Sequence, residues 1–544
     1  MTRTTARLLI TWRRLRRRSD SGAPLKLWLS AIIVAAVAAY GVIAFRWLID
    51  FVSLVAFGQP EEKVASGAAQ LPFLRAWSAP VAGGFCVSGL LYLAVRRGWL
   101  PEGRGQGIAE VIEARAVRDG KISWRAGVAS AVVSAVSVGS GGSAGREGPA
   151  VHIGGAVASS LYNAVGFTAK DRRTLIGCGA AAAVSASFNA PVAGVIFALE
   201  VILGNYAISV FGPIAAAAAM ATFIARTHLG DIAVFPAPEY AAPSAIDIPL
   251  SALLGLICGL MASFFLVITE YLTEKVRDVA AARGYPLILL PPIAGVVVGF
   301  IGAFQPEVFG VGYEAITGAL NGSYTISMLA LLGILKIIAT AITVSCRFGG
   351  GVFSPGLILG VFAGAAYGAG LQQLAPDVAA SATFFAMIGM GAASGAIIGA
   401  PISTTLVVFE LTGDYTMTMS LMVAVALATL VTQSLVGKSF FQWQLSRRGY
   451  DLSEGPQGVI LKTIRVRDVM DPMPQDAPLT KEAAKLSTSQ SLGEALARLE
   501  REDEPGLPVT DPGEPLAVIG YLSRIKALAA YNRALIDNNI EHHR

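Results

Sequence analysis

Glu147 is an ionisable residue in a stretch of the chain that is otherwise almost entirely apolar, in the motif Gly145-Arg146-Glu147-Gly148-Pro149. A carboxyl group buried in such a stretch is a candidate functional group by default. When ionised, its carboxylate is itself an anion and could occupy an anion-binding site. When protonated or displaced, it would leave that site. The chemistry it offers is therefore reversible occupation of an anion site, controlled by the protonation of the carboxyl group. The alternative is a structural salt bridge to Arg146 at the start of a helix.

The composition of the chain predicts a polytopic membrane protein. Of 544 residues, 54% are hydrophobic and 15% are charged, whereas a typical soluble chain is about 25% charged. A helix that spans a bilayer needs roughly 20 mostly apolar residues. Runs of about that length without Asp, Glu, Lys or Arg lie at 27–45, 76–95, 126–145, 148–169, 174–199, 201–225, 248–269, 284–306, 315–335, 348–376, 378–409 and 415–437.

Charge divides the chain into four expected parts. Residues 1–26 form a basic segment with Arg and Lys residues against a single acidic one, Asp20. By the positive-inside rule this segment is cytoplasmic, and we read its arginines as a topology signal rather than as a nucleic-acid site. Residues 27–449 form the membrane domain, 450–462 a linker and 463–544 a small soluble domain. We expect a multi-pass protein of the plasma membrane with both termini in the cytoplasm.

The membrane domain contains an internal repeat. The segment Ile176–Ala181 recurs as Ile388–Ala393 at an offset of 212 residues, and the segment from Asn189 to Glu200 recurs from Gly399 to Glu410 at an offset of 210. Chance similarity of apolar segments would not keep both a proline and a glutamate at the same spacing. Internal repeats are common in transporters, where the binding site lies between them.

Two glycine-rich stretches, at 139–145 and 349–351, interrupt these apolar runs. Glycine continues a helix poorly, and each stretch precedes a run that is able to form a helix. Helix N-termini are therefore expected inside the protein. Such ends present free N–H groups and a partial positive charge, which bind anions. Partial charges also let an ion leave again, as conduction requires. A cation path would instead need carboxylates, which the apolar runs almost lack.

The motif at Gly145–Pro149, together with Gly351-Val352-Phe353-Ser354-Pro355, resembles the CLC family of chloride channels and chloride/proton exchangers. The resemblance covers roughly residues 27–449. It implies an all-α polytopic membrane fold built as an inverted repeat of short, tilted and broken helices. It also implies a homodimer with a separate pore in each subunit, with an interface near 191–225 and 402–436.

The resemblance also implies roles for individual residues. Glu147 corresponds to the gate, which carries protons in the exchangers, and the backbone amides of Val352 and Phe353 correspond to ligands of the central anion. Arg146 and Gly148, which flank Glu147, are expected at the same anion site. The ring of Phe353 could equally be a packed core aromatic.

Three departures from the family pattern affect the expected mechanism. Gly105-Gln106-Gly107 places a glutamine amide where the family has a serine hydroxyl, so selectivity could differ, unless Gln106 points away and only the glycines matter. Phe441 stands where the family has a tyrosine that faces the ion from the inside. Val201, after Glu200, replaces a second glutamate that loads protons in many exchangers. Val201 favours a channel, or an exchanger with a water path.

The C-terminal segment resembles a single CBS motif, carried by Val466–Met470, Ser491–Leu496 and Gly506–Val509, with Val518–Arg524 as its last strand and turn. The period of this region predicts the order strand, helix, strand, strand, helix. CBS motifs normally act in pairs and often bind adenine nucleotides. With one motif present, we expect a dimerisation or packing module of α/β fold rather than a nucleotide site.

The sequence therefore predicts transport of chloride or another small anion through a pore in each subunit, gated by Glu147 and leaning to a channel mechanism. A proton-coupled anion exchanger is the main alternative, and a divalent-cation transporter with CBS regulation is a remote one.

An enzyme is not favoured, because no candidate nucleophile has partners at a clear spacing. The scattered cysteines, at 86, 178, 258 and 346, form no metal-binding or disulfide pattern. We expect no cofactor. The expected partners are a second subunit, the lipid bilayer, small anions and, for an exchanger, protons, with no nucleic acid.

Overall fold

A computed structural model of the chain describes residues 22–100, 107–118, 120–165, 167–230, 244–375, 380–412, 415–450, 461, 464–472, 485–511 and 514–543. Its contacts divide the chain into two compact units. The first, the membrane unit, ends at Phe441 and leaves out the short segment Ala116–Arg118. The second, the tail unit, comprises that segment and the chain from Gln442 onward.

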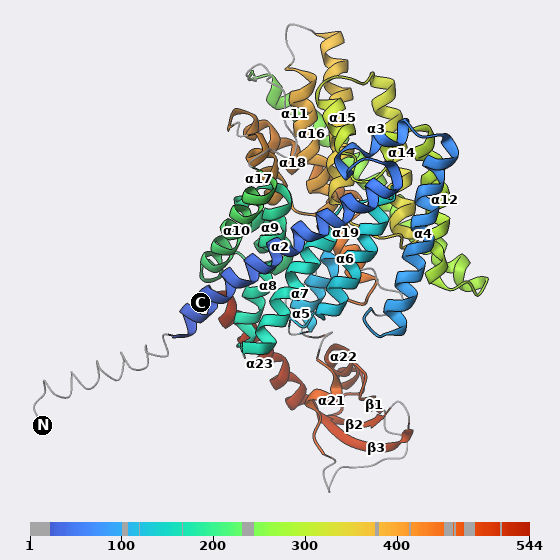
Figure 1. The fold of residues 1–544 in the computed structure, drawn as a ribbon. Coiled ribbons are helices and arrows are strands. Elements are labelled where there is room, and N and C mark those ends of the chain that lie inside the picture. The colour runs from blue at the N-terminus through green and yellow to red at the C-terminus, as the bar shows by residue number, and fades with distance from the viewer. Residues whose placement is uncertain are drawn as a thin grey trace, which may run out of the picture. The chain divides into compact units, whose positions relative to one another are not determined.

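The membrane unit consists of helices (Figure 1). In chain order they are α2 (Gly22–Phe57), η1 (Glu61–Lys63), α3 (Val64–Ala69), α4 (Phe73–Arg96), α5 (Ile108–Val117), α6 (Trp124–Gly139), α7 (Glu147–Val165), α8 (Ala169–Phe188), α9 (Pro191–Phe197), η2 (Ala198–Leu203), α10 (Ile208–Leu229), α11 (Asp247–Ala282), η3 (Leu287–Leu289), α12 (Leu290–Phe304), η4 (Pro306–Val308), α13 (Tyr313–Leu320), α14 (Ile326–Ser345), α15 (Phe353–Leu374), α16 (Ala382–Ile398), α17 (Pro401–Thr412), α18 (Tyr415–Leu435) and α19 (Phe440–Ser446).

Among the described residues, eight helical segments are long and apolar enough to cross a membrane. They lie in α2, α4, α10, α11, in η3 with α12, in α14, in α15, and in α18 with α19. Shorter apolar helices, among them α6, α16 and α17, accompany them. This arrangement confirms the predicted multi-pass, all-α membrane fold with short and broken helices.

The charge-free runs of the sequence do not correspond to single helices. The run 174–199 is broken at Asn189 and the run 378–409 at Gly399, both of which adopt left-handed backbone angles (φ 57° and 71°). A left-handed residue ends a helix by turning the chain out of the helical path. Pro191 and Pro401 then begin the next helix, a position that needs no N–H donor. The breaks therefore follow from local residue types.

Two close helix crossings repeat between the halves of the membrane unit. A Cβ atom added at Gly154 of α7 would overlap the backbone of Gly179 in α8, and one added at Gly360 of α15 would overlap the backbone of Gly389 in α16. Gly179 and Gly389 are 210 residues apart. The sequence motif repeats at an offset of 212 residues, whereas the glycines that make equivalent helix contacts are 210 residues apart. The predicted offset is therefore wrong by two residues as a structural alignment.

A second pair of contacts joins the halves reciprocally. The carboxylate of Glu410 accepts hydrogen bonds from the N–H groups of Val192 and Ala193 at the start of α9, at 3.0 and 2.7 Å. The carboxylate of Glu200 accepts them from Ile402 and Ser403 at the start of α17, at 3.0 and 2.8 Å. Each half thus caps a helix of the other. A reciprocal pattern of this kind is what a two-fold relation between the repeats produces.

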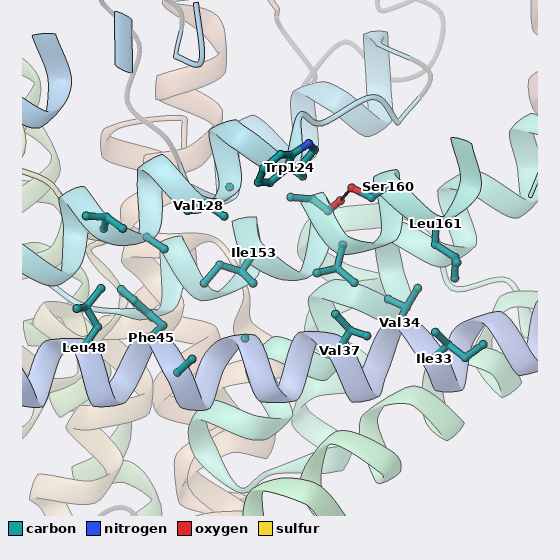
Figure 2. Close-up of a pocket in the computed structure, with 17 residues that line it drawn as sticks. Ile33, Val34, Val37, Phe45, Leu48, Trp124, Val128, Ile153, Ser160 and Leu161 are labelled. Atoms are coloured by element: carbon teal, nitrogen blue, oxygen red, sulfur yellow. Dashed lines mark hydrogen bonds between the residues drawn. The ribbon is translucent and has the colours of Figure 1, made fainter. Parts of the chain in front are cut away.

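A long apolar groove lies between α2, α6 and α7 (Figure 2). Its volume is about 750 Å³, and its wall includes Ile33 and Val37 of α2, Trp124 and Val128 of α6 and Ile153 of α7. The first four of these side chains are also exposed to the surroundings of the unit. Of the residues predicted for the anion site, none that the structure describes lines this groove, so the groove is separate from that region.

The tail unit contains a three-stranded sheet in the order β1-β2-β3. Its elements are α21 (Val466–Val469), β1 (Leu486–Ser487), α22 (Leu492–Arg501), β2 (Gly506–Asp511), β3 (Glu514–Ser523) and α23 (Arg524–His543). β1 is parallel to β2, and β2 is antiparallel to β3. Ser491 and Glu494 form a capping box at the start of α22, and buried apolar residues such as Leu499 and Leu522 form the core. From Leu486 onward the elements follow the predicted order strand, helix, strand, strand, helix, but Val466–Val469 forms a helix and the first strand is Leu486–Ser487.

Candidate anion-binding site

The two glycine-rich stretches meet directly. Gly145 and Gly351 form an antiparallel bridge in which the N–H of each donates to the carbonyl oxygen of the other, at 2.7 Å in both directions. Helix α7 begins two residues after Gly145, at Glu147, and α15 begins two residues after Gly351, at Phe353. The bridge therefore holds the N-termini of α7 and α15 together inside the membrane unit, as the broken runs predicted.

A third helix end reaches the same place. A Cβ atom added at Gly148 would lie 3.6 Å from the Cα of Gly351 and 3.9 Å from the Cα of Gly107. Gly107 directly precedes α5, which begins at Ile108. At these distances the three backbones lie close together, within ordinary van der Waals contact of a Cβ atom. Three helix N-termini, each with free N–H groups and a partial positive charge, thus converge on one region, which is the arrangement that binds a dehydrated anion.

The carboxylate of Glu147 occupies this region. Glu147 is 2% exposed, and its Oε1 accepts a hydrogen bond from the Ser354 hydroxyl. A Cβ added at Gly145 would overlap Oε2 of Glu147 and would lie 3.1 Å from the amide nitrogen of Ser354. Within the part of the chain that the structure describes, Oε2 has no hydrogen-bond partner. The carboxylate therefore lies across the gap between α7 and α15, where a free anion would be expected.

Arg146 forms its salt bridge with a different carboxylate, that of Glu61. Its buried guanidinium donates from Nη1 to Oε2 of Glu61 at 2.8 Å and lies 5.1 Å from the ring centre of Tyr313. The structural alternative for Glu147, a salt bridge to Arg146, is thus not the pairing that the structure shows. The sequence analysis missed Glu61 and Tyr313, since nothing in their local sequence marks them as partners of Arg146.

Val352 and Phe353 lie where their amides can face the site. Val352 directly precedes α15 and Phe353 is its first residue, and both are buried. The ring of Phe353 packs against the rings of Phe188 and Phe197, with centroid distances of 5.1 and 6.4 Å. The Phe353 side chain is therefore part of the core, and only its backbone is available to an anion.

The other residues predicted for the site or for proton transfer make none of the contacts described above between the starts of α5, α7 and α15. Gly105 and Gln106 lie outside the described residues. Phe441 is buried in α19 with its ring 5.9 Å from that of Phe440. Val201 lies half-buried in η2, next to the capping residue Glu200. Of the candidate site residues, the structure thus brings together Glu147, Gly148, Gly107, Val352 and Phe353, and it adds Ser354.

Comparison with known proteins identifies the fold and the family. Residues 83–433 match the family model described as voltage gated chloride channel. The chain is 30% identical over 423 residues to a putative chloride channel protein ClcB-like of Ralstonia nicotianae, covering 77% of this chain and 96% of the relative. It is also 30% identical over 438 residues to the H(+)/Cl(−) exchange transporter ClcA of Vibrio parahaemolyticus, covering 79% of this chain and 91% of that protein.

Solved structures share the fold at lower identity. A slow cyanobacterial Cl−/H+ antiporter matches with a TM-score of 0.68 at 23% identity, covering 78% of this chain and 97% of that structure. A CLC-type fluoride/proton antiporter matches with a TM-score of 0.63 at 22% identity, covering 77% and 98%. The chain therefore belongs to the voltage-gated chloride channel (CLC) family of membrane anion transport proteins.

Proposed function

We propose that this protein exchanges chloride, or a similar small anion, for protons across a membrane, with Glu147 as the group that carries the proton. The observation that supports this most directly is the place of the Glu147 carboxylate between the N-termini of α7 and α15. An ionised carboxylate there competes with a permeant anion. A protonated one loses its attraction to the helix ends and leaves, so that anion and proton movements become linked.

Relatives favour the exchanger over the channel. The ClcA proteins of Vibrio parahaemolyticus and Salmonella are named as H(+)/Cl(−) exchange transporters, and two similar solved structures are described as antiporters. The sequence analysis leaned toward a channel because Val201 carries no proton. On the exchanger proposal, protons reach Glu147 from the cytoplasm by a path of water rather than through a side chain at position 201. The ClcB-like relative keeps the channel as the second candidate.

The anion site that we propose uses backbone donors for the most part. Gly107, Gly148, Val352 and Phe353 are the described residues whose amides lie near the bridge of Gly145 and Gly351. Gly105 and the amide side chain of Gln106 are proposed as further ligands, and the Phe441 ring is proposed as a constriction on the inner side. No metal or organic cofactor is part of this proposal.

We further propose a homodimer in the plasma membrane with both termini in the cytoplasm. Exposed apolar side chains on α9, α10, α17 and α18, among them Val192, Phe211, Ile402 and Met422, support an interface that draws on both repeats. The tail unit is proposed as a packing module of the CBS type that does not need nucleotide.

The decisive experiment measures coupling in vesicles. The purified protein is reconstituted into liposomes with a chloride gradient and no initial pH gradient, and internal pH and chloride are followed together. We expect protons to move uphill, driven by chloride, with protein-free liposomes as the control. Chloride flux without proton movement would overturn the exchanger in favour of the channel, and the absence of any anion flux would overturn both.

A further inference from the structure

The Ser354 hydroxyl makes a contact between the two halves of the membrane unit. It donates to Oε1 of Glu147, 207 positions away in the chain. Ser354 is 1% exposed and Glu147 is 2% exposed. A hydroxyl that donates to an ionised group makes one of the stronger kinds of hydrogen bond, and in a buried place water does not readily replace it. The contact therefore acts on the carboxylate in its charged form.

Three other hydroxyl groups at helix starts in this unit serve their own helix, whereas that of Ser403 in α17 donates to Glu200 of the other repeat. Thr168, Thr325 and Ser381 each accept a hydrogen bond from a backbone N–H in the first turn of the helix they precede. Ser354 differs from these three because it follows the first residue of α15 and directs its hydroxyl to the other repeat. At the equivalent place in the first half, before Pro149 as Ser354 is before Pro355, stands Gly148, which has no side chain.

Two buried basic side chains of the membrane unit, Arg146 and Lys336, form their hydrogen bonds with groups other than the Glu147 carboxylate. Arg146 is paired with Glu61 and lies over Tyr313. The buried Lys336 of α14 donates to the carbonyl oxygens of Val308 and Gly310, both at 2.9 Å. Among the residues that the structure describes, Ser354 is therefore the side chain that donates a hydrogen bond to the Glu147 carboxylate.

We infer that Ser354 is a positioning residue that holds the ionised Glu147 side chain in the anion site and so sets the pH at which the protein opens to anions. This inference rests on the proposed function, in which Glu147 is the movable carboxylate. The hydroxyl stabilises the charged, blocking form of the gate. Flux then begins only when the pH is low enough to protonate the carboxylate against that hydrogen bond.

The test is the pH dependence of chloride flux from liposomes at symmetrical pH. Removal of the donor in Ser354→Ala is expected to shift the midpoint of the flux curve toward higher pH by roughly one unit, the size expected for a hydrogen bond to a charged group. Ser354→Cys, which keeps a weak donor, is expected to give a smaller shift in the same direction. Ser394→Ala is the matched control, because the buried Ser394 hydroxyl donates to the Met390 carbonyl of its own helix at 2.6 Å.

The Glu147→Ala background separates this inference from the proposed function. There the flux curve is expected to be flat, and adding Ser354→Ala should leave it flat. A wild-type midpoint in Ser354→Ala, beside a flat curve in Glu147→Ala, would overturn the role of Ser354 and leave the proposed function standing. A curve that still depends on pH in Glu147→Ala would overturn the proposed function itself. If Ser354→Ala does not fold, Ser354→Cys decides: a midpoint equal to wild type contradicts the inference, and an alkaline shift supports it.

Discussion

The two halves of the membrane unit share a scaffold and differ in chemistry. In each half a pair of helices crosses at glycines, at Gly154 and Gly179 in one and at Gly360 and Gly389 in the other. Each half also supplies a glutamate that caps a helix of its counterpart. These shared contacts are made of backbone and caps, which do not distinguish one ion from another. They explain how two unequal sequences hold their helix ends in matching places.

The difference appears where the halves meet. The first half contributes Glu147, a side chain that can carry a charge, whereas the second contributes Ser354, a neutral donor that holds it. A pair of carboxylates at this place would repel each other and bind a proton between them. A pair of serines would bind an anion without a gate. The comparison indicates that the scaffold can be symmetric while the proposed transport chemistry needs one movable charge on one side.

The largest effect is expected from breaking the shared crossings. Gly154→Ala and Gly360→Ala each place a methyl group into the backbone of the neighbouring helix, which should cost about 3 kcal/mol or more, because backbones cannot move aside as side chains can. Yield and thermal unfolding in detergent measure this. Gly333→Ala is the control, since a Cβ at Gly333 of α14 meets no atom within 4 Å. Thermal unfolding equal to wild type in both crossing variants would contradict the described packing.

The next effect concerns the asymmetric group. Glu147→Gln is neutral at every pH, so it should abolish proton movement and the pH dependence of flux while leaving chloride flux, measured in the same liposomes. Glu410→Gln is a useful comparison, because it alters a glutamate that caps a helix rather than the one proposed to lie in the anion site. Coupling that persists in Glu147→Gln would show that the proton uses another group.

A smaller effect is expected from removing either reciprocal cap. Glu200→Ala and Glu410→Ala each leave two N–H groups at a helix start without their carboxylate. Loss of a cap typically costs about 0.5–2 kcal/mol. Thermal unfolding should show a loss for both variants, somewhat larger for Glu200→Ala, because Glu200 also accepts a hydrogen bond from the Ser403 hydroxyl. A loss confined to one of them would mean that the two caps are not equivalent and would break the symmetry inferred here.

The smallest effect is expected from the one hydrogen bond by which the two glutamate caps differ. Ser403 also donates its hydroxyl to Glu200, whereas the matching residue of the first half, Ala193, has only its backbone N–H to offer Glu410. Ser403→Ala should therefore cost about 1 kcal/mol, the net value of one hydrogen bond, and make the two caps alike. Glu200→Ala combined with Ser403→Ala should lose little more than Glu200→Ala alone. Additive losses would indicate a separate role for the hydroxyl.

Much of the fold was predictable from local patterns. Apolar runs indicated the membrane domain, and the glycine-rich stretches indicated where helices begin inside it. Glu147 could be singled out because an ionisable residue is rare in such runs. These features depend on residues close in sequence, whose hydrophobicity and backbone preferences act before any tertiary contact forms. The repeat offset of the segment Ile176–Ala181 was misassigned because the segment has two glycines two residues apart. The sequence does not show which of the two glycines contacts the neighbouring helix.

What the sequence by itself determined is therefore the membrane fold, the breaks in its helices and the charged residue at one of them. Only the tertiary structure decided the partners: Gly145 with Gly351, Arg146 with Glu61, and Ser354 with Glu147. The physical reason is that these contacts join residues 85 to 207 positions apart. Whether such groups meet depends on how whole helices pack against one another, and no local preference of the chain records that.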